Sequence, residues 1–423
     1  MKKYALVGTG SRAGMFYEAI AKTYKSTCVM VGLCDQSQTR MNYANKKLAA
    51  LGHKEVPTYN HISFEKMITE TKPDVVIVTS TDRTHHDYIV RAMEMGCDVI
   101  TEKPMTIDEK KAKEITDAIA RTGRDLRVTF NYRYAPNNTK IRELIMDGVI
   151  GDVFSVHFEW LLDTSHGADY FRRWHRNKHN SGGLLVHKST HHFDLVNFWL
   201  GAEPQHVFAF GDLNFYGRHN AEKRGMTEFT YRSHGSKIKD DPFAIDMASN
   251  EAMKAMYLDA EEDSGYIRDR SVFTDDISIE DTMGVIVKYN TNAILTYSLN
   301  SYMPWEGFSV NFNGSKGRIE YKVMEKSYVN AGGNRDDEGA LKKKDIMVFP
   351  LFAAPYDVEV EEAKGSHGGG DAVMLEDIFG TPGNDRFKRA AGVKDGIMSI
   401  MTGICANKAI ASGMPQTIKE LIQ

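Results

Sequence analysis

Two glycines and an alanine lie at a fixed spacing just after the first apolar run of the chain. The segment Gly8–Ala13 reads G-x-G-x-x-A, follows the run Tyr4–Val7 and opens a helical pattern. Such glycines allow a tight turn and a close backbone approach to a diphosphate, and the first amides of the helix attract negative charge. The motif therefore predicts a dinucleotide site formed by Gly8, Gly10, Ser11, Arg12 and Ala13.

An acidic residue at the end of the second apolar run indicates which dinucleotide is bound. Asp35 lies 25 residues after Gly10, where a carboxylate can bind the hydroxyls of the adenosine ribose. Its negative charge would repel a 2′-phosphate, so the sequence favours NAD as the cofactor. Arg40 is close enough in the chain to keep NADP as the alternative.

A lysine follows another short apolar run. Glu102-Lys103-Pro104 comes directly after Val99–Thr101, which we expect to be a strand of a parallel sheet. Ligands of open α/β sheets bind at the carboxyl ends of such strands. Because a lysine in a loop is more often a solvated surface group, Lys103 becomes a candidate only through this position.

A histidine-rich segment carries three titratable groups at helical spacing. His187, His191 and Asp194 follow the turn Gly182-Gly183 at positions i, i+4 and i+7, so a continuous helix would place them on one face. Oxidation of a carbinol needs a base for the hydroxyl proton and a cation for the developing oxyanion. His191 could be that base with Lys103 as the cation, or Lys103 could accept the proton itself, and Asp194 could orient the imidazole.

The elements that must position these groups alternate between strands and helices in the first third of the chain. This alternation predicts a Rossmann-like, doubly wound parallel sheet. We expect a dinucleotide-binding domain over residues 1–130. Its strands are predicted at Tyr4–Val7, Val29–Cys34, Val75–Thr79, Val99–Thr101 and Leu126–Phe130, and its helices at Arg12–Lys25, Arg40–Leu51, Phe64–Thr71, His86–Glu94 and Ile107–Arg121.

The pattern then changes to closely spaced strands with tight turns. We expect residues 131–423 to form an α+β domain with an open, mostly antiparallel sheet that binds substrate and mediates oligomerisation. Residues 214–281 form a polar insertion with a helix over Pro242–Tyr257 and no core of its own, and Arg335–Lys344 is predicted as a charged surface loop. The predicted strands are Val153–Leu161, Val207–Gly211, Met283–Tyr289, Ala293–Asn300, Phe308–Asn313 and Arg318–Tyr321.

Composition excludes several classes of protein. The chain has 423 residues, enough for two or three domains, and a net charge of −4, which gives no global electrostatic reason to bind nucleic acid. The sequence has no apolar stretch long enough to span a membrane and no recognisable signal peptide. Its four scattered cysteines fit a reducing cytoplasm and form no metal site.

These motifs, in this order and spacing, resemble those of the Gfo/Idh/MocA oxidoreductases. Members of that family have a Rossmann domain followed by an α/β domain with an open sheet. The resemblance rests on Gly8–Ala13, Glu102–Pro104 and Gly182–Asp194, covers most of the chain and is weakest over residues 214–281. His187 departs from it, because most members carry an aspartate there, and this exchange introduces a group that can change its charge near neutral pH.

The resemblance implies roles for individual residues. Lys103 would reach the nicotinamide and the substrate hydroxyl, His191 would be the catalytic histidine, and Asp194 the acid that follows it. Residues of the cofactor site would include Thr79, Thr81, His85 and Glu102 in addition to the glycine motif. Substrate contacts are predicted for Arg133, Trp174, His187 and His192, with His367 and Asp371, the expected N-cap of a following helix, as further candidates.

Other groups permit more than one interpretation. His175 and His179 have the i, i+4 spacing of a zinc pair, but a basic loop beside a polar or anionic substrate, or a solvated surface, is favoured. Trp160 and Trp174 could stack on a sugar ring or belong to an aromatic core. We predict no metal.

The leading hypothesis is an NAD-dependent oxidoreductase acting on a hydroxyl of a sugar, sugar derivative or cyclic polyol. The alternative is a redox-neutral NAD-dependent glycoside hydrolase, which oxidises C3 transiently and eliminates; His187, His192 and Tyr132 could supply its extra acid and base. A non-catalytic cofactor-binding regulator would be expected to lack the Lys103–His191 pair, which is present. A small-molecule substrate and a homodimer or homotetramer are the predicted partners.

Overall fold

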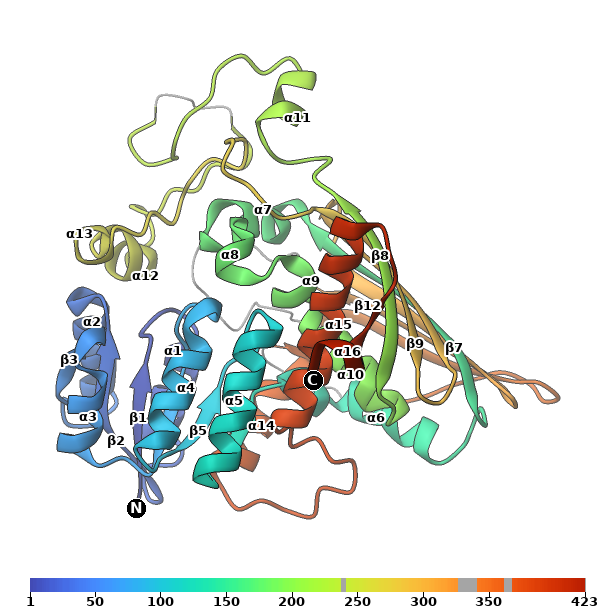
Figure 1. Ribbon diagram of the computed structural model, residues 1–423, viewed down its shortest axis with the longest axis horizontal. Coiled ribbons are helices and arrows are strands. Elements are labelled where there is room, and N and C mark those ends of the chain that lie inside the picture. Colours follow the sequence, from blue (N-terminus) through green and yellow to red (C-terminus); the bar gives the residue numbers. More distant parts are fainter. Residues whose placement is uncertain (237–240, 326–340, 361–366, 423) are drawn as a thin grey trace.

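The computed structural model describes residues 1–236, 241–325, 341–360 and 367–422 (Figure 1). Most of the predicted charged loop at 335–344 lies outside these residues. Its last four residues were predicted incorrectly, because the strand β13 begins at Leu341. In the described part of the chain, every helix is too short or too polar to cross a lipid bilayer.

The first sheet has six parallel strands in the order β3-β2-β1-β4-β5-β6, which confirms the predicted doubly wound fold. All four residues of β4 are buried, as expected for a strand covered on both faces. The strand β3 was not predicted, because a segment of three residues has no recognisable periodicity. The strands are β1 Lys2–Val7, β2 Cys28–Asp35, β3 Thr58–Asn60, β4 Val75–Val78, β5 Asp98–Thr101 and β6 Leu126–Val128, and the helices between them are α1 Ala13–Lys22, α2 Gln38–Ala50, α3 Phe64–Thr71, α4 His85–Glu94 and α5 Glu109–Thr122.

The second sheet has nine strands in the order β14-β13-β12-β11-β7-β10-β9-β8-β15. Every neighbouring pair is antiparallel except β7 and β10, so the predicted mostly antiparallel sheet is confirmed. Asn292, with φ of +68°, forms the predicted tight turn between β9 and β10. The strands are β7 Val153–Asp163, β8 Pro204–Asp212, β9 Thr282–Tyr289, β10 Ile294–Met303, β11 Gly307–Gly314, β12 Gly317–Glu325, β13 Leu341–Pro350, β14 Tyr356–Asp357 and β15 Gln416–Thr417.

Helices cover one face of this second sheet. Figure 1 shows α6 (Pro136–Met146), α10 (Ser189–Leu200) and α15 (Val393–Ser412) between the two sheets. The other face carries exposed apolar side chains, among them Phe210, which is 71% exposed, and Ile286, which is 51% exposed. A solvent-exposed face is usual for an antiparallel sheet, but large exposed apolar side chains on that face are not.

The helical segments of the insertion between β8 and β9 differ in position from the predicted one. The predicted helix at Pro242–Tyr257 was wrong over its first nine residues, and helical structure begins only at Glu251. Its elements are α11 Arg218–Lys223, α12 Glu251–Met253, the π-helical turn η5 Lys254–Leu258 and α13 Glu261–Ser264. A small apolar cluster of Ile245, Met247, Met253, Met256 and Tyr257 holds the segment together, and Tyr43 of α2 packs against it. Figure 1 shows α12 and α13 beside α2, so the insertion reaches back to a helix that covers the first sheet.

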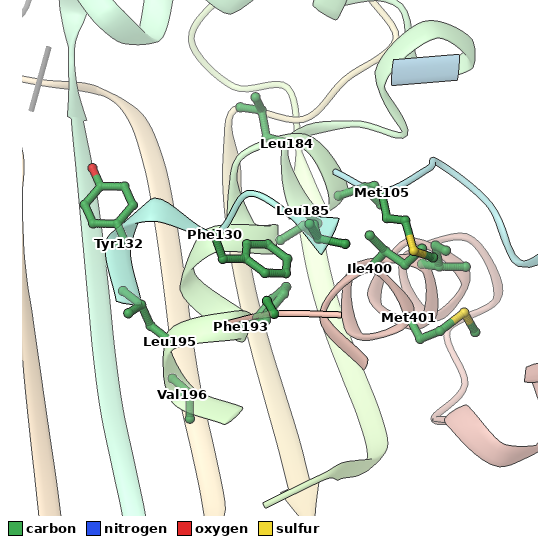
Figure 2. Close-up of a cluster of buried hydrophobic side chains, with 14 of the residues drawn as sticks. Met105, Phe130, Tyr132, Leu184, Leu185, Phe193, Leu195, Val196, Ile400 and Met401 are labelled. Carbon is green, nitrogen blue, oxygen red and sulfur yellow. The ribbon is translucent and has the colours of Figure 1, made fainter. Parts of the chain in front are cut away.

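One apolar core joins the two sheets. Phe130 follows β6, Leu185 lies on α9 (Leu184–His187) and Phe193 lies on α10, and all three are at most 1% exposed. Figure 2 shows them close to Met105, which follows β5, and to Ile400 of α15. This shared core holds the segments that follow β5 and β6 in a fixed position relative to α9, α10 and α15.

Helices α15 and α9 approach so closely that a glycine is required between them. A Cβ added at Gly403 would lie 2.1 Å from the carbonyl oxygen of Leu185, whereas one at Gly396 of the same helix would meet mainly the flexible side chain of Met105. Alanine normally stabilises a helix interior relative to glycine. A methionine side chain can move away from an added methyl group, whereas backbone atoms cannot. Substitution by alanine should therefore be tolerated at Gly396 and destabilise the protein at Gly403.

We expect Gly403→Ala to lower the free energy of unfolding by about 1–3 kcal/mol through overpacking. Gly396→Ala is the matched control and should change it by less than about 1 kcal/mol. Urea denaturation of the two variants and the wild type measures both values. A Gly403→Ala protein at least as stable as the wild type would contradict the close helix contact.

Candidate functional site

A cavity of about 380 Å³ lies at the carboxyl ends of β1, β2, β4 and β5, against the second sheet's helices. Its lining brings together most of the predicted site residues. Those of the cofactor set are Gly8, Gly10, Ser11, Arg12, Asp35, Thr79, Thr81, His85, Glu102 and Lys103, and those of the catalytic and substrate sets are Trp174, His187 and His191. Ala13, Arg133, His192 and Asp194 lie outside this lining.

The glycine-rich turn leaves room for a ligand at the start of α1. Gly8 has φ of +92°, and a Cβ there would lie 2.5 Å from the backbone nitrogen of Ser80, so the turn packs tightly on the end of β4. A Cβ at Gly10, in contrast, would meet no atom of the described chain within 4 Å. The open space in front of Gly10, beside the first amides of α1, fits the diphosphate of a dinucleotide.

The carboxylate of Asp35 organises the neighbouring turns. Its Oδ2 accepts hydrogen bonds from the backbone nitrogen of Thr9 at 2.5 Å and from Thr9 Oγ1 at 3.0 Å. Its Oδ1 accepts from the backbone nitrogen of Ser37 and from Arg40 Nη2, each at 2.8 Å. Asp35 and Arg40 thus form an ion pair, and both line the cavity.

Lys103 is half-buried at the centre of the cavity wall. Its Nζ donates a hydrogen bond of 3.2 Å to the backbone carbonyl of His187. Burial lowers the pKa of Lys103 to about 8, although the nearby carboxylates of Asp82 and Glu102 act in the opposite direction. The amine can therefore hold or release a proton near neutral pH. The Lys103–Pro104 peptide is cis, and Glu102 Oε1 accepts from Arg12 Nε at 2.8 Å.

Asp82 is a cavity residue that the sequence analysis missed. Its Oδ2 lies 2.5 Å from His187 Nδ1, and both side chains are buried. Burial raises the pKa of Asp82 and lowers that of His187, so the pair favours its neutral forms. The signal was available, because Asp82 follows β4 at the same sheet edge as Lys103 follows β5.

The helix predicted to carry three catalytic groups is interrupted. Lys188 lies between α9 and α10, and His187 and His191 both line the cavity. The ring of His191 lies in edge-to-face contact with Tyr132, with ring centroids 4.9 Å apart. These contacts fix the imidazole within one wall of the cavity.

Asp194 has a different partner from the predicted one. Both its oxygens accept hydrogen bonds from Arg133, from Nε at 2.7 Å and from Nη2 at 2.5 Å. Arg133 Nη2 also donates to Asp395 Oδ1 at 2.8 Å. Asp194 and Arg133 therefore form a buried ion pair that links α10 to the segment after β6 and to α15, and the predicted substrate contact of Arg133 is replaced by this pairing.

Two aromatic predictions have different outcomes. Trp160 is fully buried and stacks on His192 at 3.9 Å between ring centroids, and His192 Nδ1 bonds to the hydroxyl of Tyr297. Both therefore belong to the core rather than to the cavity, which corrects the prediction for His192. Trp174 lines the cavity and stacks on His175.

The two histidines at zinc-pair spacing and Asp371 also have defined places. His175 is buried in the cavity wall and His179 is exposed, and within the described residues no group of three His, Cys, Asp or Glu side chains could hold a metal ion. Asp371 is not the predicted N-cap, which is Gly369; it lies in the first turn of α14 (Gly370–Phe379) and accepts from Asn131 Nδ2 at 2.5 Å. Ser366 and the side chain of His367 lie outside the described residues.

Comparison with known proteins gives consistent matches over the whole chain. Residues 2–130 match the family model "Oxidoreductase family, NAD-binding Rossmann fold", and residues 142–418 match "Oxidoreductase family, C-terminal alpha/beta domain". The chain is 38% identical to the "Putative oxidoreductase YteT" of Bacillus subtilis, covering 100% of this chain and 99% of that one. It is 35% identical over 135 residues to an inositol 2-dehydrogenase of Rhizobium meliloti, covering 32% of this chain and 38% of that protein.

Among solved structures, an oxidoreductase domain protein from Kribbella flavida has a TM-score of 0.67 with 16% identity. The match covers 99% of each chain. At this identity the likeness concerns the fold alone.

We expect Gly10→Ala to weaken NADH binding at least tenfold with little change in stability. The added methyl group projects into the open space of the cavity, where a diphosphate would lie, and it meets no protein atom. Gly8→Ala is the contrasting variant, because its methyl group would collide with the backbone of Ser80 and destabilise the fold. NADH fluorescence titration and thermal unfolding separate the two effects. Unchanged NADH affinity in a folded Gly10→Ala protein would contradict the assigned diphosphate position.

Proposed function

The chain belongs to the Gfo/Idh/MocA oxidoreductase family, and on that basis we propose that it transfers a hydride between NAD and a hydroxyl of a sugar, sugar derivative or cyclic polyol. The observation that carries this proposal is the convergence of Lys103 and His191 on the cavity that the glycine-rich turn borders. The similarity to an inositol 2-dehydrogenase supports the polyol or sugar class.

The residues of the chain fit a nicotinamide dinucleotide. The open space before Gly10 would hold its diphosphate. Asp35 would hold the hydroxyls of its ribose, which favours NAD, and NADP is the alternative because Arg40 pairs with Asp35 in the same cavity lining. Thr79, Thr81 and His85 would border the cofactor, since they line the same cavity. When bound, the nicotinamide supplies the hydride acceptor or donor.

Lys103 and His191 would handle the hydroxyl proton. A neutral Lys103 amine can take up the proton of a hydroxyl, and its pKa of about 8 makes the neutral form available. His191 would then hold the substrate oxygen, or act as the base while protonated Lys103 stabilises the oxyanion. Asp194 would act as a positioning residue, through Arg133 and α10 rather than by contact with His191.

A redox-neutral glycoside hydrolase is the second candidate function. The observation that favours it is the Asp82–His187 pair, which places a further acid–base group beside Lys103. Elimination from an oxidised sugar and addition of water need such a group in addition to the one that moves the hydroxyl proton.

One preparation tested on two substrate panels distinguishes the candidates. We expect free sugars and polyols to give steady NADH formation at 340 nm, and aryl glycosides to release no phenol. Lys103→Ala and His191→Ala should each lower turnover by about 10²–10⁴-fold, because each removes acid–base or electrostatic catalysis. Tightly bound NAD with phenol release and no net NADH would favour the hydrolase, and near wild-type turnover of both variants would refute the assignment of the two residues.

The pH profile tests which group takes the proton. If Lys103 is the base, only its neutral form is active in alcohol oxidation, so kcat/KM should rise with pH up to about 8 and then remain level. Lys103→Arg, which stays protonated, should lose this rise along with most of the activity. A kcat/KM that falls above pH 8 would instead indicate His191 as the base with Lys103 as the required cation.

We also propose that the chain forms a homo-oligomer through the open face of the second sheet, in the cytoplasm. Phe210 and Ile286 are exposed on this face, and the four cysteines are free and buried, as suits a reducing compartment. We expect Phe210→Glu to produce a folded monomer, measured by light scattering after size exclusion. A wild-type protein that is monomeric at micromolar concentration would refute the interface.

A further inference from the structure

A group of arginines surrounds a single carboxylate in the wall of the cavity. Asp169 belongs to α7 (Thr164–Arg172), Arg173 directly follows that helix, and Arg268 comes from the insertion. Arg268 contacts both oxygens of Asp169, at 2.6 and 2.9 Å, and Arg173 Nη1 lies 3.2 Å from Oδ2. The third arginine, Arg172, lies at 3.5 Å and turns its Nε to the carbonyl of Phe243.

This wall carries more positive than negative charge. Three guanidinium groups neighbour one carboxylate, and Asp169 is ionised, because these arginines hold its pKa well below the usual range although burial acts to raise it. Arg173 and Arg268 line the cavity together with Asp169. The cation left in excess therefore faces the space where a ligand would bind.

Arg268 is incompletely satisfied by the protein. It is only 3% exposed, and within the described residues its Nε has no hydrogen-bond acceptor. A buried charged donor without an acceptor is unfavourable. An anionic group in the cavity would neutralise the excess positive charge of Arg173 and Arg268, which both line it.

The arginine wall is close to the proposed catalytic groups. Arg173 influences the pKa values of both Asp82 and His187, and the ring of Trp174, the next residue, is 5.8 Å from that of His187. A ligand held by Arg173 and Arg268 would therefore lie near His187, in the same cavity that Lys103 lines. The turn at Gly8–Ala13 already provides amides for a diphosphate, which leaves these arginines for the substrate.

We propose that the substrate is an acidic sugar, whose carboxylate is bound by Arg173 and Arg268 while Lys103 and His191 act on one of its hydroxyls. The proposal rests on the proposed function and names the substrate class of the same site. A guanidinium pair matches a carboxylate in charge and in planar geometry. A neutral sugar would leave the buried cation uncompensated.

The first test needs no variant. We compare D-galacturonate and D-glucuronate with D-galactose, D-glucose and the methyl ester of galacturonate, all with NAD. The acids should have at least tenfold higher kcat/KM than the neutral sugars and the ester, mainly through a lower KM. The ester isolates the effect of charge, because it keeps the shape of the acid and loses its charge. Calorimetric binding to the NADH complex, run in parallel, should show the same preference without requiring turnover.

The second test uses Arg173→Gln and Arg268→Gln. Each should lower kcat/KM for the acids by about 10–100-fold and change that for neutral sugars less than threefold. Arg268→Lys keeps the charge but loses the planar, two-pronged geometry of the guanidinium group. Its kcat/KM for the acids should therefore lie between those of the wild type and of Arg268→Gln. Arg218→Gln is the matched control in the same insertion, because Arg218 is exposed and pairs with Glu222, and it should behave as the wild type.

Specific results would overturn the proposal. Neutral sugars or the ester that bind and react as well as the acids would refute the carboxylate site. If the arginine variants weaken NADH affinity and leave the acid preference intact, the arginines bind the cofactor's diphosphate instead. Acid binding with no NADH formation from any compound would support the carboxylate site and refute the proposed function, so the two failures are distinguishable.

Discussion

The apolar contact between the two halves of the chain is the constraint on which the cavity depends. Phe130, Leu185, Phe193 and Ile400 are buried together (Figure 2), and the close approach at Gly403 allows α15 to lie against α9. Because interiors are close-packed and deform little, this contact fixes where the segment after β5 meets the α9–α10 junction. Each polar group of the cavity takes its position from that apolar framework.

Burial then determines the chemistry of those polar groups. Lys103 has a lowered pKa because it is desolvated, and the carboxylates of Asp82 and Glu102 limit the shift. The Asp82–His187 pair can remain buried because each group supplies the other's hydrogen bond. Outside the cavity lining, Arg133 and Asp194 form a buried ion pair that anchors α10, so buried pairs of polar groups serve both architecture and reactivity.

Sequence patterns predicted the elements well in the first domain and failed at a three-residue strand and in the polar insertion. The predicted helix Phe64–Thr71 matches α3, whereas the three residues of β3 were missed and Pro242–Asn250 was assigned to a helix that is absent there. Among the predicted site residues, the glycine-rich turn, Lys103, His187 and His191 line the cavity. Asp82 also lines it but was not predicted. Asp194 was predicted to orient the ring of His191, whereas it pairs with Arg133. Spacing along a helix gives no information about a partner that lies 61 residues away.

The sequence by itself determined the two sheets, the glycine-rich turn and the residue types available for proton transfer, because these depend on local periodicity and on short motifs. Only the tertiary structure decided which groups meet: Asp82 with His187, Asp194 with Arg133, and Arg268 of the insertion with Asp169. Each of these pairs joins segments that are distant in the chain. Their energies come from burial and geometry, which exist only after the apolar core has brought the segments together.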